Sequence, residues 1–592
     1  MGVRIPERPY RGVQLACLAA LVGGFAEPAR ALDLSFDQGE ISGYFDTTVT
    51  FGTALRLQDR DPALIGRVNG GTANSVNVDN GDLNYDRGDL TSLQAKVNHE
   101  LDLQWRNYGL FARLFYFYDV VVVDFQTART PIPNAAKDVN GRDIQLQDAY
   151  LTGDFEVGPA LLTVKLGDQV LNWGESTFIP NGINGINPVD LTRLRVAGAE
   201  IREALEPVPT LDIGLGLGPN LSLEGFYQFL HRKTKIDGDG TFFSISDPFS
   251  PGGSRLFLGF GSIPDFPVPP PGTAAPIGPF VPRASDEDAR NLGQFGLALR
   301  YFAEELNQTE LGLYYLHYHS NLPLGSLRTG DLAALNAGDY AASSSYFADY
   351  PEDIDLIGGS FNTSIGTSGL ALQGEVSYRP NQPLQVDSVE LVYAGLSPVN
   401  PQIFGQNQVG VFGFEQEIQG YRRENVLQAQ MTGSQTFGPT FGADDLLLLA
   451  EIGATWVPSL PAQDELRFDG PGTFTSGNPF FTEVGVQPAT QEGGFATPFS
   501  CGYRLLARAS YLGAFGPVNL APQLAFAHDV SGTTPRPLGN FVAHRKAVTL
   551  SLGADYLNAF NGEIAYTNFI GAQGFNLLRD RDFVSLSVSY SF

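Results

Sequence analysis

The end of the chain alternates strictly between apolar and polar residues. Serines at positions 585, 587, 589 and 591 alternate with Val584, Leu586, Val588 and Tyr590. Successive side chains of a strand point to opposite faces, so this segment predicts a strand with one apolar and one polar face. A strand of a transmembrane barrel has this pattern, apolar toward lipid and polar toward the lumen. An edge strand of a soluble sandwich has the same period, so the choice depends on the rest of the chain.

Similar alternation recurs along the chain, in segments near the roughly 10 residues that a tilted membrane strand needs. It predicts eighteen strands, near residues 40–56, 92–105, 109–123, 144–155, 160–173, 207–218, 221–232, 291–303, 310–320, 353–365, 369–379, 424–437, 445–457, 501–513, 517–530, 545–557, 562–571 and 582–592. The sequence therefore predicts an all-β fold, a single transmembrane antiparallel β-barrel over residues 32–592.

The connections between these segments alternate in length. Short connections rich in turn-forming residues include 107–108, 158–159, 219–220, 367–368, 515–516 and 561–562. Long connections include 57–91, 233–290, 321–352, 380–423 and 458–500. Bacterial barrels have an even number of strands, short periplasmic turns and longer outer loops. A periplasmic N-terminus places every long connection on the outer side.

The N-terminus has the layout of a secretory signal peptide. Arg4, Arg8 and Arg11 precede an apolar run from Leu15 to Ala26, and a small-x-small site follows at residues 29–31. The run is too short for a membrane helix, which needs about 20 apolar residues. We therefore expect residues 1–31 to be removed. The residues before Cys17 lack the pattern of a lipid-anchored protein.

Composition excludes several classes of protein. The chain has 592 residues and a formal charge of −27, which excludes a nucleic-acid binder with a basic surface. Charged residues make up only 17%, fewer than in most soluble domains. The two cysteines and six histidines show no metal-ligand spacing, so we expect no structural zinc and no cofactor.

The connection 174–206 is the most unusual one. It combines Gly, Asn and Pro punctuation with nearly balanced charges, and it predicts a short helix whose Leu191, Leu194 and Ile201 make apolar contacts. Such a segment could fold inward and pair with the polar lumen, as a constriction; an ordinary outer loop is the alternative. The constriction candidates in the segment and the polar strand faces are Trp173, Glu175, Asp190, Arg193, Arg195, Glu200, Arg202, Glu375 and Arg379.

Several stretches resemble an outer-membrane β-barrel family catalogued as domain of unknown function 1302. They are DAYL at 148–151, LGDQVLNWGESTFIPNGINGINPVDLTRLR at 166–195, YPEDIDLIGGSFNTSIG at 350–366, GEVSYRPNQPLQ at 374–385, HDVSG at 528–532 and DRDFVSLSVSYSF at 580–592. The resemblance implies a Gram-negative outer membrane. It also implies the company of a periplasmic LolB-like lipoprotein and an inner-membrane transporter of the resistance-nodulation-division type. Phe592 with Tyr590 resembles the C-terminal signal that the barrel assembly machinery recognises.

These features favour a barrel that transports or translocates a hydrophobic or lipid-like compound through a lumen gated by the inward-folded segment. A general diffusion porin is one alternative. A non-conducting structural or adhesion barrel that presents acidic outer loops is another; the acidic residues are Asp82, Asp86, Asp89, Asp286, Glu287 and Asp288.

An enzyme is disfavoured. The best candidate is His528-Asp529-Val530-Ser531, but neighbouring residues of a strand point to opposite faces and would not align as a relay. His317 and His319 share a strand face without a third ligand nearby, so we expect wall residues there and no metal.

Overall fold

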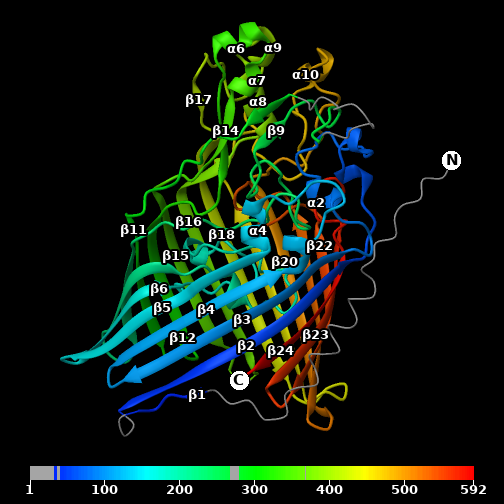
Figure 1. Cartoon of the computed structure of the whole chain (residues 1–592). Coiled ribbons are helices and arrows are strands. Elements are labelled where there is room, and N and C mark those ends of the chain that lie inside the picture. The colour runs from blue at the N-terminus through cyan, green and yellow to red at the C-terminus, as the bar shows by residue number, and fades with distance from the viewer. Residues whose placement is uncertain (1–31, 37–39, 267–278, 367) are drawn as a thin grey trace, which may run out of the picture.

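The protein is an antiparallel β-barrel (Figure 1). The structure, a computed structural model, describes residues 32–36, 40–266, 279–366 and 368–592. The barrel strands are β2 (Ile41–Arg56), β3 (Leu90–Trp105), β4 (Tyr108–Asp119), β5 (Arg142–Val157), β6 (Ala160–Gln169), β7 (Val208–Gly216), β8 (Leu221–Gln228), β11 (Gln294–Ala303), β12 (Thr309–Tyr318), β15 (Ile354–Ser364), β16 (Leu370–Gln385), β18 (Tyr421–Phe437), β19 (Asp445–Trp456), β20 (Phe499–Phe515), β21 (Val518–Ser531), β22 (Lys546–Tyr556), β23 (Phe560–Ile570) and β24 (Phe583–Ser591). The predicted number of strands, eighteen, is confirmed, and each predicted segment overlaps one of them.

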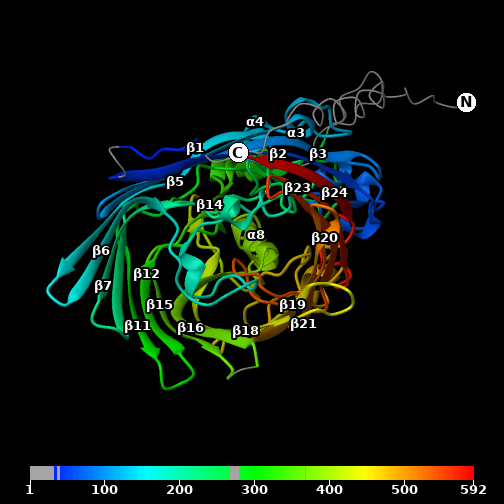
Figure 2. The ribbon, with the colours of Figure 1, turned by 90° about the horizontal axis from the view of Figure 1, so that it is seen from below.

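The first and last barrel strands pair with each other and close the sheet. Val49 of β2 lies opposite Tyr590 of β24, and every other barrel strand pairs with the barrel strands before and after it. The view along the barrel shows the closed ring (Figure 2). A closed ring leaves no free sheet edge among these strands.

Burial in this barrel is the reverse of that in a water-soluble protein. In β19, Glu451 is fully buried while its neighbour Ile452 is 54% exposed. The alternation follows from the pleat, which turns polar side chains inward and apolar side chains outward. The outer surface is therefore apolar and the interior polar.

The long connections gather at one end of the barrel and carry the remaining elements except β1, which precedes β2 (Figure 1). The short strands are β1 (Leu32–Asp33), which pairs with β2, and β9 (Arg255–Phe257), β10 (Phe280–Pro282), β13 (Leu324–Arg328), β14 (Ser345–Asp349) and β17 (Glu417–Ile418). The helices are η2 (Pro62–Leu64), η3 (Arg67–Asn69), α2 (Asn80–Leu83), α3 (Val120–Asp124), α4 (Asn134–Asn140), η4 (Ile183–Ile186), α5 (Ile201–Ala204), α6 (Leu332–Ala337), α7 (Tyr340–Ser343), α8 (Ser388–Leu396), α9 (Pro401–Phe404) and α10 (Pro479–Glu483).

Three predicted strands end four residues earlier than expected, and one of them, 221–232, ends at Gln228. The predicted strand 109–123 ends at Asp119, whose side chain accepts hydrogen bonds from the backbone N–H groups of Val121 and Val122 and so begins helix α3. The predicted strand 160–173 ends at Gln169. The predicted signal peptide, residues 1–31, lies outside the described residues. Within the described part of the chain, no helix is long and apolar enough to cross a membrane.

Candidate functional site

The connection between β6 and β7, residues 170–207, runs inside the ring (Figure 2). We call it the β6–β7 segment. Its contacts fall on inward-facing side chains of strands on opposite sides of the barrel, with β16, β18 and β19 on one side and β2, β3 and β24 on the other. The segment therefore crosses the interior.

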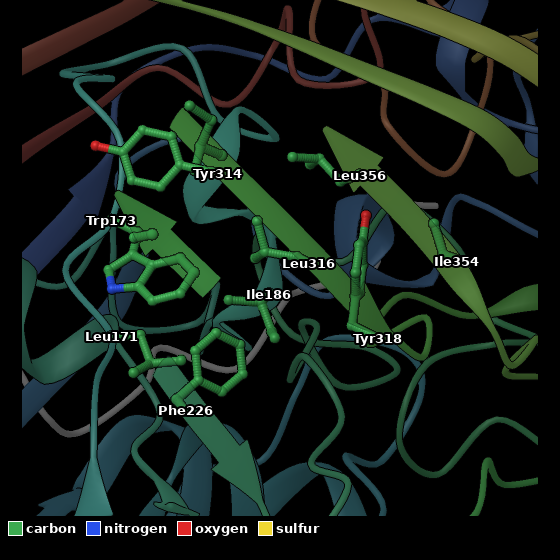
Figure 3. Packing of buried hydrophobic residues seen from close by; sticks show 11 residues of the cluster. Leu171, Trp173, Ile186, Phe226, Tyr314, Leu316, Tyr318, Ile354 and Leu356 are labelled. Carbon is green, nitrogen blue, oxygen red and sulfur yellow. The ribbon is translucent and has the colours of Figure 1, made fainter. Parts of the chain in front are cut away.

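An apolar cluster fixes the start of the segment against the wall (Figure 3). Trp173 is only 2% exposed and packs its ring edge-to-face against Phe226 of β8, with ring centroids 4.9 Å apart. Its indole Nε1 donates a hydrogen bond of 2.6 Å to Oε1 of Glu224. The other members of the cluster are Leu171, Ile183, Ile186, Ala298, Tyr314, Leu316, Tyr318, Ile354 and Leu356. Burying each large apolar side chain contributes roughly 1.5–3 kcal/mol.

Glu375 of β16 binds the segment through its backbone. Oε2 accepts a hydrogen bond of 2.5 Å from the N–H of Glu175, and Oε1 accepts one of 2.9 Å from the N–H of Ile183. Nε2 of Gln430 donates to the same Oε1 at 3.0 Å. One buried carboxylate therefore closes a loop of the segment onto β16.

Glu451 of β19 binds three consecutive backbone amides. Oε1 accepts from the N–H of Thr177 at 2.9 Å, and Oε2 accepts from those of Phe178 and Ile179 at 2.7 and 2.8 Å. Hydrogen bonds to an ionised acceptor are roughly twice as strong as neutral ones. Glu451 was not among the predicted site residues. It is the one acidic residue between Leu446 and Trp456 of β19, where most residues are apolar, and this isolation is the signal in the sequence that could have identified it.

Arg379 of β16 completes this side. Its Nη2 donates hydrogen bonds of 2.7 Å to the carbonyl oxygens of both Asn181 and Gly182, and its Nε donates one of 3.0 Å to the hydroxyl of Tyr318. The guanidinium is buried, so these carbonyls provide the polar partners that burial demands. Glu375, Glu451 and Arg379 thus hold residues 175–183 against β16 and β19.

The far side of the segment rests on β2, β3 and β24. Nζ of Lys96 lies 2.6 Å from Oε2 of Glu203 and 2.6 Å from the carbonyl oxygen of Gly198, inside the barrel. A side chain at Gly52 would lie 2.8 Å from the carbonyl oxygen of Ala197, so only glycine allows this approach. The segment is therefore bound at both walls.

The remaining predicted residues of the segment form three other groups. Arg193 lies over the ring of Phe117, with Cζ 3.4 Å from the ring centroid, and its Nε is 3.6 Å from Oδ2 of Asp190. Arg195 pairs with Asp237 of the following loop at 3.4 Å. Arg202 pairs with both Glu200 and Glu100 of β3. The structure thus brings Trp173, Glu175, Glu375 and Arg379 together and leaves these five apart from them.

Two expectations about apolar contacts and acidic loops are wrong. Leu194 and Ile201 are 49% and 74% exposed, because residues 191–195 form turns and the only α-helical turn covers Ile201–Ala204. Asp82 is not a solvated surface charge. It is buried and its Oδ1 lies 2.8 Å from Nη2 of Arg56 and 3.3 Å from Nε of Arg581.

Glu175 is a titratable residue of the segment, and its backbone N–H bonds to Glu375 of the wall. Its carboxylate accepts a hydrogen bond of 3.2 Å from Nδ2 of Asn362. Burial, followed by repulsion from Glu310 and Glu375, raises the pKa of Glu175 to about 7. This carboxyl is therefore partly protonated near neutral pH.

The histidine candidates form no catalytic or metal arrangement. His528 lies 3.3 Å from the hydroxyl of Tyr503, whereas Asp529 points inward to Arg504 and Arg545. Nδ1 of His317 lies 2.8 Å from Asp355. Among the described residues, no three His, Cys, Asp or Glu side chains are placed to hold a metal ion.

The predicted assembly signal ends the last strand. The ring of Tyr590 lies 4.5 Å from that of Phe560 and 5.4 Å from that of Phe592, measured between centroids. The backbone of Phe592 pairs with Thr47 of β2. The C-terminal residues therefore take part in closing the ring.

The barrel is similar to solved outer-membrane proteins at low sequence identity. The structure of Acinetobacter baumannii OccAB3 has a TM-score of 0.42 and 10% identity, over 93% of this chain and 99% of that chain. The outer membrane protein opdK from Pseudomonas aeruginosa has a TM-score of 0.40 and 9% identity, over 93% of this chain and 98% of that chain.

The sequence itself gives a more extensive match. A search of curated proteins found no match. The family model described as "Protein of unknown function (DUF1302)" matches residues 13–592. The match covers nearly the whole chain and confirms the resemblance noted in the sequence, so the protein belongs to this family.

Proposed function

We propose that the protein is a transport barrel of the Gram-negative outer membrane, and that the β6–β7 segment narrows its passage. The observation that carries the proposal is that carboxylates and a guanidinium of the inner wall bind the backbone of this segment on one side, while Lys96 binds it on the other. A barrel of 16–18 strands leaves an aqueous channel unless something fills it. The segment supplies that filling.

The outer surface supports a membrane location. Large apolar side chains such as Ile452, Leu313 and Leu550 are more than half exposed on outward-facing strand positions. In water such a surface would cause aggregation, whereas a bilayer covers it. Tyr590 and Phe592 at the C-terminus support recognition by the barrel assembly machinery.

The proposed cargo is a hydrophobic or lipid-like compound. The family resemblance implies a LolB-like periplasmic lipoprotein and an inner-membrane resistance-nodulation-division transporter as partners, and both handle such compounds. The apolar cluster around Trp173 is buried and anchors the segment, so the cargo class rests on the family resemblance.

Single-channel recording tests the proposal. Residues 32–592 are refolded into planar bilayers beside a variant that lacks residues 178–203. We expect rare or small current steps from the intact protein and larger steps from the deletion. Large, steady steps from the intact protein would indicate a general diffusion porin. Silence from both proteins would indicate a structural or adhesion barrel.

A further inference from the structure

We propose that solutes cross the level of the β6–β7 segment between that segment and the inward face of β21, β22 and β23. This inference rests on the proposed transport function and adds the location of the passage. We define the small-residue face as the inward-facing residues Ala525, Ala527, Ala547, Thr549, Ser551 and Thr567.

The first observation is the distribution of contacts around the ring. In the described part of the chain, the hydrogen bonds, ion pairs and ring contacts between the segment and the strands involve β3, β4, β5, β8, β12, β15, β16, β18 and β19, and β2 and β24 approach the segment closely at Gly52 and Ser587. None of them involves β20, β21, β22 or β23. Asn181 does bond to the loop after β21, where its Nδ2 lies 2.8 Å from Oδ1 of Asn540. The segment therefore leaves one sector of the wall without a partner.

The second observation is the position of that sector along the barrel axis. Strand pairing runs from Glu451 through Arg504 and Ala527 to Ala547 of β22. From the other side, pairing runs from Ser587, which touches Gly198 of the segment, to Gly553 of β22. Thr549 and Ser551 lie between Ala547 and Gly553, so they stand at the level where the segment crosses.

The third observation is burial. Inward-facing side chains that the segment or the loops cover are buried, as Lys96, Gln428 and Thr455 are. The small-residue face remains partly exposed at the same level. These side chains are therefore less covered than Lys96, Gln428 and Thr455, although Ala565, the inward neighbour of Ser551 on β23, is only 8% exposed.

The chemistry of the face favours uncharged or amphiphilic solutes. None of its side chains is charged or larger than threonine, so the backbone of the wall is close to the passage. Alanine methyl groups can contact an apolar body, and the hydroxyls of Thr549 and Ser551 can bind a polar group. On the described strands β20–β23, the inward charges without an ion pair are Arg508, Asp555 and Glu563, and Asp555 stands at the end of β22, away from Thr549.

Cysteine labelling tests the location of the passage. Cys501 is the only cysteine in residues 32–592, so Cys501→Ser gives a cysteine-free full barrel for refolding into liposomes. Thr549→Cys and Ser551→Cys place a thiol on the small-residue face. Thr455→Cys is the matched control, because Thr455 also faces inward but is only 1% exposed. A charged, water-soluble methanethiosulfonate is the probe, and mass spectrometry gives the labelling rate.

We expect both face cysteines to react at least about tenfold faster than the control, in line with their exposure to water. Modification of Thr549→Cys should also lower any current through the barrel. Equal or faster labelling of Thr455→Cys would overturn the inferred location. Labelling does not require conduction, so silence of both the intact protein and the deletion variant, together with fast labelling at residue 549, would contradict the transport function and leave the water-filled path standing.

Discussion

Oε2 of Glu451 accepts a hydrogen bond of 2.7 Å from the backbone N–H of Phe178, 273 residues earlier in the chain. The bond joins the barrel wall to a segment that has almost no regular secondary structure of its own. The acceptor is a buried carboxylate and the donors are backbone amides, and the side chains of Thr177 and Ile179 add a hydrogen bond to Thr432 and a buried apolar contact. The wall thus determines where the segment lies.

The three tryptophans report separately on the outside and the inside of the barrel. Trp105 and Trp456 are about half exposed on the outward face, whereas Trp173 is buried inside. Brominated lipids should therefore quench the fluorescence of Trp105 and Trp456 and leave the fluorescence of Trp173 unquenched. The unquenched emission should disappear in Trp173→Phe, measured in reconstituted vesicles. Complete quenching of the unmodified protein would place Trp173 at the lipid surface and contradict the fold.

The ion pair between Lys96 and Glu203 predicts that the effects of replacing the two residues on the free energy of unfolding are strongly non-additive. Removing one partner of a buried pair leaves an uncompensated charge and typically costs about 3–5 kcal/mol. Lys96→Met should therefore lower the urea midpoint of unfolding, and Lys96→Met combined with Glu203→Gln should recover most of the loss. Gel mobility of unheated samples separates folded from unfolded barrels. Additive losses in the double variant would show that the two side chains do not interact.

Glu175 predicts a pH dependence in the segment. Its pKa in the folded chain, about 7, lies above the ordinary value of 4.5, so the fold favours the protonated acid. Its contribution to stability is therefore greatest below pH 4.5, falls as the pH rises to about 7, and is constant above that. Hydrogen exchange of residues 174–186, corrected for intrinsic rates, should be faster at pH 8 than at pH 5.

The matched variant separates this carboxyl from its neighbours. Glu175→Gln should remove most of the difference in exchange between the two pH values, because the amide does not ionise. Glu563→Gln, an inward acid that makes no contact with the segment, should leave the difference unchanged. A pH difference that persists in Glu175→Gln would assign the effect to another group.

The strands could be predicted because lipid and lumen impose a period of two on each of them. The short strands β13 and β14 could not, since β13 pairs with β14 and with β17 of the next long loop, and neither shows an extended alternation. Their hydrogen-bond partners come from residues that the sequence pattern does not relate. The local sequence pattern is sufficient to predict the strands of the barrel and insufficient to predict the structure of its loops.

The site was partly predictable for a similar reason. Polar residues on inward faces, such as Glu375 and Arg379, follow from strand register. Which of them meets the β6–β7 segment depends on how that segment crosses the lumen, and no local signal determines this. Leu194 shows the limit most clearly: it has the helical spacing of a core residue, yet the turns of the segment expose it.

The central claim is that the wall holds the segment across the passage, and single-channel recording of Glu375→Gln/Glu451→Gln tests it most directly. Each glutamine has one acceptor oxygen in place of two, and its NH₂ group faces backbone N–H donors with which it cannot bond. Several buried N–H groups of the segment therefore lose their acceptor, and each loss costs about 1–3 kcal/mol of stability. We expect the fraction of time in a high-conductance state to rise by about tenfold or more, since 1.4 kcal/mol corresponds to a factor of ten. Glu563→Gln should leave this fraction unchanged, because Glu563 lies on β23 away from the held residues 175–183, and its lost charge changes only the size of the current steps. Identical currents from the double variant and the unmodified barrel would contradict the claim that these carboxylates hold a constriction.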